Sequence, residues 1–274
     1  MIAVTGASGF IGSALCAALS RAGREVLTLS LRRSNTPLYL AGARAVVHLA
    51  ALVHRRGAKG ASFYEANVEL TRSVGRAAAA AGARMVFVST VKVHGEESTR
   101  ALRESEPLAP AGDYARSKAQ AEEVLRAIPG LQLAVLRPPL VYGAGVKANF
   151  LMLMTAIARG IPMPLASVVN RRSFVYVGNL VDALLRCIDD PHAVGRTYLV
   201  SDGAPMSTPA LCRGIGAALG RAPRLFPFPP KWLPGPLSRS LEVDDSALRG
   251  ELGWRAPFSA EEALRATADW YRSR

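Results

Sequence analysis

The sequence predicts an α/β fold with a doubly wound parallel sheet and a smaller C-terminal α/β region. Short β-branched runs alternate with helix-length amphipathic segments through residues 2–138, as in parallel strands joined by crossover helices. A glycine-rich turn, "TGASGFIG" at residues 5–12, links the first strand to the first helix. Half of the 274 residues are hydrophobic, which supplies a large core.

The first βαβ unit comprises a strand at 2–5, a helix at 10–21 and a strand at 25–30. Gly6 allows a tight turn, Gly9 lets the backbone approach a pyrophosphate, and Gly12 lets helix and strand pack closely. The N–H groups at the start of the helix then face the phosphates. This context favours dinucleotide binding over a glycine-rich turn without a ligand.

The end of the second strand indicates which dinucleotide binds. An acidic residue there would bind the ribose 2′-hydroxyl of NAD, whereas this chain has Ser30, Arg32 and Arg33. Guanidinium groups suit a 2′-phosphate, which favours NADP, with NAD as the alternative if both arginines are solvated.

The alternation continues with strands at 45–51, 85–90 and 133–138, and helices at 63–81 and 113–128. The fold is therefore of the Rossmann type, in which ligands bind beyond the carboxyl ends of the strands. Ala50, Ala51, Thr90 and Arg137 lie at such ends.

The C-terminal part is expected to form a smaller α/β region. A helix capped by Thr208 runs to Gly220, and Ser259 with Glu262 has capping-box spacing before the last helix. We expect residues 1–143 to form mainly the NAD(P)-binding domain, to which 172–200 return. Residues 144–171 and 201–274 form mainly the substrate-binding region.

Tyr114 and Lys118 are four residues apart and share one face of a predicted helix. The alternative is an ordinary exposed pair, but the glycine turn and the strand ending in Ser89 and Thr90 make the set specific. Together they resemble the extended short-chain dehydrogenase/reductase type of the NAD-dependent epimerase/dehydratase family. The resemblance implies that Tyr114 transfers a proton at a substrate oxygen and that Thr90 hydrogen-bonds it. Lys118 holds the nicotinamide ribose, and its ammonium lowers the pKa of Tyr114.

Longer segments extend the resemblance to the UDP-glucose 4-epimerase-like branch, which includes UDP-4-keto-N-acetylquinovosamine reductases. They are "STVKVHGE" (89–96), "RPPLVYGAGVKANF" (137–150) and "RRSFVYVGNLVDAL" (171–184). Asn149 is implied to contact the nucleotide and Arg172 the diphosphate, unless Arg172 is only a surface charge. The implied substrate-binding residues are Lys92, Val93, His94, Asn149 and Arg172, although tyrosine is more usual at position 94.

The implied cofactor-binding residues come from both halves of the predicted sheet. Asn67 matches an asparagine that orients the neighbouring catalytic group. The set is Gly6, Ser8, Gly9, Phe10, Ile11, Gly12, Arg32, Arg33, Leu49, Ala50, Ala51, Asn67, Ser89, Tyr114, Lys118, Pro138 and Val141. The segment 31–44 is too short for the usual extra helix and strand, so the adenine pocket is not assigned.

Three functions fit these residues. The first is reduction of a UDP-4-keto-6-deoxy-N-acetylhexosamine by NADPH for surface polysaccharide synthesis. The second is a UDP-hexose or UDP-N-acetylhexosamine 4-epimerase with tightly bound NAD. The third is a non-catalytic NAD(P) sensor, which would not need the set of Thr90, Tyr114 and Lys118.

Net charge, cysteine content and histidine spacing limit the partners, the compartment and the metal sites that we expect for this protein. The net charge is +13, from 34 basic and 21 acidic residues, but no run of five or six basic residues points to nucleic acid. Three single cysteines, no transmembrane run and no signal-peptide pattern predict a cytoplasmic protein. No histidine has a ligand-spaced partner, so no metal site is expected. A homodimer is expected, and the positive charge leaves peripheral membrane association open.

Overall fold

The computed structural model describes residues 1–30, 40–52 and 60–274. Arg32 and Arg33 lie outside the described residues. Six parallel strands form the main sheet in the order β2-β1-β3-β4-β5-β8. Their bounds are β1 Ile2–Thr5, β2 Val26–Leu29, β3 Ala45–His48, β4 Arg84–Val88, β5 Leu133–Arg137 and β8 Thr197–Leu199. Strand β2 lies on one side of β1, and β3 and the later strands lie on the other side, so the strand order changes direction between β1 and β3. Ligands bind at this point in sheets of this kind.

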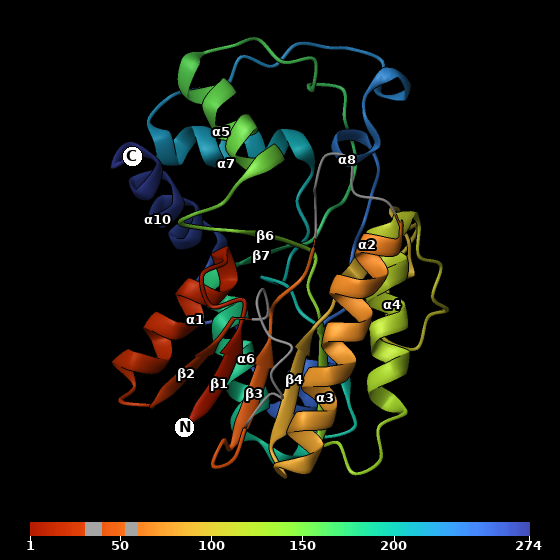
Figure 1. Ribbon diagram of the computed structural model, residues 1–274. Coiled ribbons are helices and arrows are strands. Elements are labelled where there is room, and N and C mark those ends of the chain that lie inside the picture. Colours follow the sequence, from red (N-terminus) through yellow and green to blue (C-terminus); the bar gives the residue numbers. More distant parts are fainter. Residues whose placement is uncertain (31–39, 53–59) are drawn as a thin grey trace.

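Helices cover both faces of this sheet (Figure 1). Helices α1 (Phe10–Arg21) and α6 (Val177–Asp189) pack together on one face, and α3 (Leu70–Ala80) and α4 (Gly112–Arg126) on the other. The strand residues alternate between the two cores: Val4 faces α1 and α6, whereas Ala3 faces α3 and α4. Because both faces are buried, the strands are almost continuously apolar, as predicted.

The helix predicted at 63–81 consists of three consecutive parts. These are α2 (Gly60–Tyr64), a π-helical turn (Glu65–Glu69) and α3. A π-helical turn inserts an extra residue into the helix and turns the side chains that follow. Asn67 lies in the middle of this turn.

A second, smaller body of structure lies above the sheet in Figure 1. It begins with the parallel pair β6 (Leu140–Tyr142) and β7 (Phe174–Tyr176). Helices α5 (Ala148–Arg159), α7 (Thr208–Leu219) and α10 (Ala260–Arg272) share a separate apolar core around Tyr142, Met154 and Ile215. We call α5, α7, α8 (Gly235–Ser238), α10 and the segments 160–173 and 220–241 the small lobe. Helix α9 (Ser246–Leu252) and Trp254 instead belong to the core of the main sheet.

The structure tests the two helix caps that the sequence predicts in the C-terminal part of the chain. Ser259 and Glu262 form the predicted capping box at the start of α10. The cap predicted at Thr208 is wrong: Ser207 Oγ accepts from the Ala210 N–H at 3.2 Å, and Thr208 is the first helical residue. The Thr208 hydroxyl donates to the Leu237 carbonyl at 2.8 Å and fastens α7 to α8. No helix in the described part of the chain is long and apolar enough to span a membrane.

Candidate active site

A cavity of about 330 Å³ opens at the carboxyl ends of the central strands. It gathers thirteen of the residues predicted from the sequence, together with two unpredicted neighbours, Val88 and Pro139. The predicted residues that line it are Gly6, Gly9, Phe10, Ile11, Gly12, Leu49, Ala51, Ser89, Thr90, Tyr114, Lys118, Pro138 and Val141. The glycine turn and the predicted catalytic residues therefore face one space, although they are far apart in the chain.

The glycine turn has the geometry that a dinucleotide needs. Gly6 has a φ of 68°, and a Cβ there would lie 2.8 Å from the Ala50 nitrogen. A Cβ on Gly12 would lie 2.2 Å from the Gly6 oxygen. Helix α1 begins after Gly9 with no side-chain cap and no acidic residue in its first turn. Its first N–H groups therefore remain available for an anion, and the turn fits a pyrophosphate.

Burial controls the charge state of Tyr114 and Lys118. Lys118 is 2% exposed, and its Nζ lies 4.1 Å from the centroid of the Phe87 ring. Burial lowers the pKa of Lys118 to about 7, against an opposing effect of the Glu122 carboxylate. Burial raises the pKa of Tyr114 to about 12. The predicted lowering of the Tyr114 pKa by the lysine is therefore not found in the protein alone, because desolvation dominates both groups.

Ser89 and Thr90 follow β4 and present hydroxyl groups at the same cavity. Thr90 Oγ1 accepts from the Lys92 N–H at 3.3 Å. Ser89 Oγ is buried and has no hydrogen-bond partner within the described residues. Buried hydroxyl groups are almost always satisfied, and the nearby Glu122 carboxylate is a protein group that can accept from this hydroxyl.

His48, at the end of β3, is bonded through both ring nitrogens. Nδ1 lies 2.7 Å from Thr5 Oγ1, and Nε2 lies 2.8 Å from Thr71 Oγ1. Thr5 Oγ1 already accepts from the N–H groups of Leu49 and Ala50, each at 3.2 Å, so its own proton points to His48. Burial, with the nearby charge of Lys118, lowers the pKa of His48 to about 3. His48 is thus a neutral structural residue.

Asn67 connects the segment after β3 to α4, the helix that carries Tyr114 and Lys118. Its Oδ1 accepts from the Leu52 N–H at 2.6 Å, and its Nδ2 donates to the Leu52 carbonyl at 3.0 Å and to Ser117 Oγ at 2.9 Å. Ser117 Oγ in turn donates to the Tyr114 carbonyl at 2.8 Å. The amide is thus occupied within the protein. Asn67 positions α4 and does not line the cavity, in contrast to its predicted contact with the cofactor.

A buried charged cluster behind the cavity was not anticipated. Glu122, one turn after Lys118, accepts two bonds from Arg137, at 3.0 and 2.6 Å. Arg137 Nη1 lies 2.8 Å from His94 Nε2, and His94 Nδ1 lies 3.4 Å from the Pro107 carbonyl. His94 is 6% exposed and is used to orient Arg137. The His94 side chain is therefore occupied within the protein, and its contact with substrate stays a prediction.

The remaining predicted residues lie outside the cavity. Val93 is fully buried, and Lys92 pairs with Glu96 at 3.2 Å. Asn149 is exposed in the first turn of α5. Arg172 Nη1 donates to the Arg239 carbonyl at 2.9 Å. Ser8 and Ala50 belong to the turn and the strand end that border the cavity, but do not line it.

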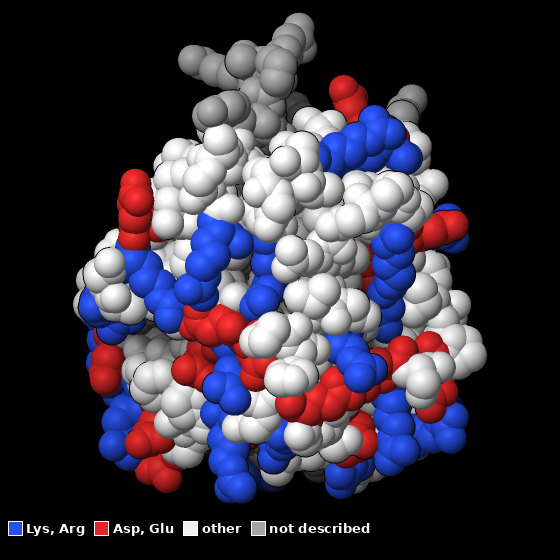
Figure 2. Space-filling model, turned by 90° about the horizontal axis from the view of Figure 1, so that it is seen from below, with Lys and Arg blue, Asp and Glu red and all other residues white. Residues whose placement is uncertain are grey.

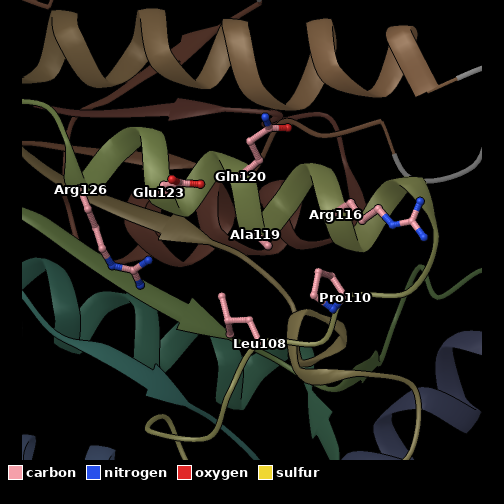
Figure 3. A pocket seen from close by; sticks show the side chains of 7 residues that line it. All are labelled: Leu108, Pro110, Arg116, Ala119, Gln120, Glu123 and Arg126. Atoms are coloured by element: carbon pink, nitrogen blue, oxygen red, sulfur yellow. The ribbon is translucent and has the colours of Figure 1, made fainter.

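A larger hollow, of about 530 Å³, lies on the outer side of α4 (Figure 3). Its lining residues are Leu108, Pro110, Arg116, Ala119, Gln120, Glu123 and Arg126. These α4 side chains are on the opposite side of the helix from Tyr114 and Lys118. The hollow contains none of the predicted site residues, so we place the active site at the smaller cavity.

Comparisons with known proteins agree with this geometry. The UDP-glucose 4-epimerase of Vibrio cholerae is 31% identical over 97% of this chain and 94% of that protein. The dTDP-4-dehydrorhamnose reductase of Mycobacterium tuberculosis H37Rv is 30% identical over 97% and 91%. The solved structure of MoeE5 in complex with UDP-glucose and NAD has a TM-score of 0.80 and 26% identity, over 99% of this chain and 98% of that chain.

The family model described as "NAD dependent epimerase/dehydratase family" matches residues 2–201. That span contains the glycine turn and all the residues that line the cavity. The chain therefore belongs to the NAD-dependent epimerase/dehydratase family, whose members are NAD(P)-dependent enzymes of the extended short-chain dehydrogenase/reductase type.

Proposed function

We propose that this protein is an NADPH-dependent reductase that acts at C4 of a nucleotide sugar. The observation that carries the proposal is the cavity in which the dinucleotide turn meets Thr90, Tyr114 and Lys118. The pKa of Tyr114, raised to about 12, keeps its phenol protonated at neutral pH. A protonated phenol is the acid that carbonyl reduction requires.

When bound, the dinucleotide supplies a hydride to the carbonyl carbon of the sugar. Tyr114 donates its proton to the carbonyl oxygen, so that the ketone becomes an alcohol and the phenol becomes a phenolate. The Thr90 hydroxyl donates to the same oxygen and stabilises its developing charge. Lys118 holds the nicotinamide ribose, and in its charged form it stabilises the phenolate until solvent reprotonates it.

The proposed substrate is a UDP-4-keto-6-deoxy-N-acetylhexosamine used for surface polysaccharide. Asn149 can match the uracil edge with a donor and an acceptor, and Arg172 can grip the diphosphate. Residues 144–171 and 201–274 supply this binding region. NADPH is preferred because Arg32 and Arg33 follow the second strand in the sequence. We further propose that the enzyme is cytoplasmic and that it forms a homodimer.

A 4-epimerase with retained NAD is the second candidate. The 31% identity to the Vibrio cholerae epimerase over 97% of the chain favours it. In that reaction Tyr114 would take the proton from the C4 hydroxyl and later return it to the same oxygen. The same residues therefore serve both reactions, and only cofactor turnover separates them.

The two candidates are separated by incubation with UDP-4-keto-6-deoxy-N-acetylglucosamine, following NADPH and NADH absorbance separately. A reductase consumes one NADPH for each sugar reduced, and Tyr114→Phe should slow this consumption by about 10²- to 10⁴-fold. The double variant Arg32→Ala/Arg33→Ala should raise KM for NADPH and leave KM for NADH unchanged. Conversion of UDP-N-acetylglucosamine to its 4-epimer without added cofactor, with NAD released on denaturation, would establish the epimerase instead.

A further inference from the structure

Two segments of the chain, 144–171 and 203–241, have a strongly one-sided charge, whereas α10 of the small lobe also carries Glu261, Glu262 and Asp269. No aspartate or glutamate occurs in residues 144–171 or 203–241, although the whole chain has 21 acidic residues. The same two segments carry eight basic residues: Lys147, Arg159, Arg171, Arg213, Arg221, Arg224, Lys231 and Arg239. By contrast, the face seen from below in Figure 2 shows positive and negative side chains side by side.

The same lobe exposes apolar side chains. Of the nine large hydrophobic residues that are exposed in the described part of the chain, five lie on the segments 161–169 and 226–232. They are Ile161 (47% exposed), Val169 (92%), Phe226 (42%), Phe228 (37%) and Trp232 (73%). We call these five side chains the apolar rim. Single exposed apolar residues are ordinary, but a concentration of them marks an interaction surface.

The two segments of the apolar rim are held together by backbone hydrogen bonds. The Phe226 N–H donates to the Met163 carbonyl at 3.0 Å, and the Ala166 N–H donates to the Phe226 carbonyl at 3.1 Å. Met163 is buried, whereas Phe226 is exposed, so the paired segments have an inner and an outer side. Both segments cross the top of the small lobe in Figure 1. These bonds hold the two segments against each other at Phe226.

Three exposed cations accompany the rim without a matching carboxylate. Arg159, Arg224 and Lys231 are exposed and form no ion pair within residues 1–30, 40–52 and 60–274. Two other basic residues of the lobe are partly neutralised, because Arg171 pairs with Glu242 and Arg239 with Glu97. Of these cations, Lys231 lies between Phe228 and Trp232, and Arg224 and Arg159 each lie two residues before a rim residue.

We propose that the apolar rim and these three cations form a docking surface for an anionic phospholipid bilayer. Tryptophan and phenylalanine favour the headgroup region, where apolar rings and water meet. Arginine and lysine gain binding energy from the negative surface potential of such a membrane. The charge complementarity selects a lipid surface over the same face of a second copy of this chain, because the segments 144–171 and 203–241 of that copy carry the same positive charge. No rim residue lines the active-site cavity, so docking leaves the catalytic groups in place.

The test is co-sedimentation of the full chain with vesicles of phosphatidylcholine alone and of phosphatidylcholine mixed with phosphatidylglycerol. We expect binding to the anionic vesicles only, weakened by high salt, with a blue shift of the Trp232 emission. Arg224→Gln/Lys231→Gln should weaken partitioning by about fivefold for each cation removed. Phe228→Ser/Trp232→Ser should abolish binding.

Matched controls lie outside the small lobe. Arg116→Gln and Leu108→Ser remove an exposed cation and an exposed apolar side chain beside α4, and neither should change vesicle binding. Equal binding to both kinds of vesicle, or no loss in the two double variants, would overturn the proposal. A concentration-dependent dimer that Phe228→Ser/Trp232→Ser dissociates would also overturn it, because a second copy would then cover the rim.

Discussion

Replacement of Lys118 by methionine should stabilise the free protein at neutral pH. The pKa of Lys118 falls from 10.5 to about 7 on folding because the ammonium is buried. The unfolded chain therefore binds more protons between these pH values, and the free energy of unfolding rises with pH across that window. At about 1.4 kcal/mol per pH unit, the buried lysine costs ~4 kcal/mol at pH 7 and ~2 kcal/mol at pH 9.

Methionine fills much of the same volume, but it loses the contact between Nζ and the Phe87 ring, 4.1 Å from its centroid. That contact stabilises the folded protein by about 1 kcal/mol, and its loss reduces the benefit of the substitution. The expected net increase in the free energy of unfolding for Lys118→Met is therefore ~3 kcal/mol at pH 7. For a chain of this length the gain corresponds to a rise in Tm of about 5 °C. The rise should shrink steadily as the pH approaches the unfolded pKa of 10.5.

Differential scanning calorimetry of the cofactor-stripped protein at several pH values measures this effect. Lys147→Met, at an exposed lysine that directly precedes α5, is the control and should change Tm little at any pH. A Lys118→Met protein that is less stable than the parent at pH 7, or whose Tm difference does not depend on pH, would refute the reasoning.

Three further variants test the site. Tyr114→Phe should lower kcat for keto-sugar reduction by about 10²- to 10⁴-fold and leave KM for NADPH unchanged, which NADPH absorbance reports; an unchanged kcat would remove the phenol from the mechanism. Gly12→Ala should abolish NADPH binding in calorimetric titration, since its Cβ would lie 2.2 Å from the Gly6 oxygen; normal affinity would contradict the turn geometry. Asn67→Leu should lower the urea-derived free energy of unfolding by about 1–3 kcal/mol, because the Leu52 peptide loses its partner; a change near zero would contradict the positioning role.

Most of the large sheet could be predicted from local patterns. The helix Phe10–Arg21 has the predicted bounds, because a glycine turn and an arginine-rich end mark it on both sides. The central strands β1, β3, β4 and β5 are recognisable because they are buried on both faces and are therefore almost entirely apolar, whereas the edge strand β2 is partly exposed. The residues of the glycine turn, Thr90, Tyr114 and Lys118 also converge as predicted, since the carboxyl ends of parallel strands meet at one edge.

The errors come from properties that local sequence does not contain. The pKa of Tyr114 depends on how deeply its side chain is buried in the folded protein. Desolvation raises this pKa, whereas the sequence predicts that the Lys118 ammonium lowers it. The segment that contains His94 does not reveal its partner Arg137, which comes from a strand 43 residues away. Two adjacent hydroxyl residues, Ser207 and Thr208, could each cap α7, and only the chain path decides between them.

The path of the chain between the two bodies of structure constrains how the protein can be taken apart. The chain leaves the main sheet after β5, forms β6 and α5, and returns through α6 to build β8. It then departs again for α7, and α9 comes back to the main core before α10 ends in the small lobe. Neither body can therefore be excised as a continuous piece of the gene. A single proteolytic nick between β8 and α7 would leave two fragments that each contain parts of both, and they should remain associated until a denaturant separates them.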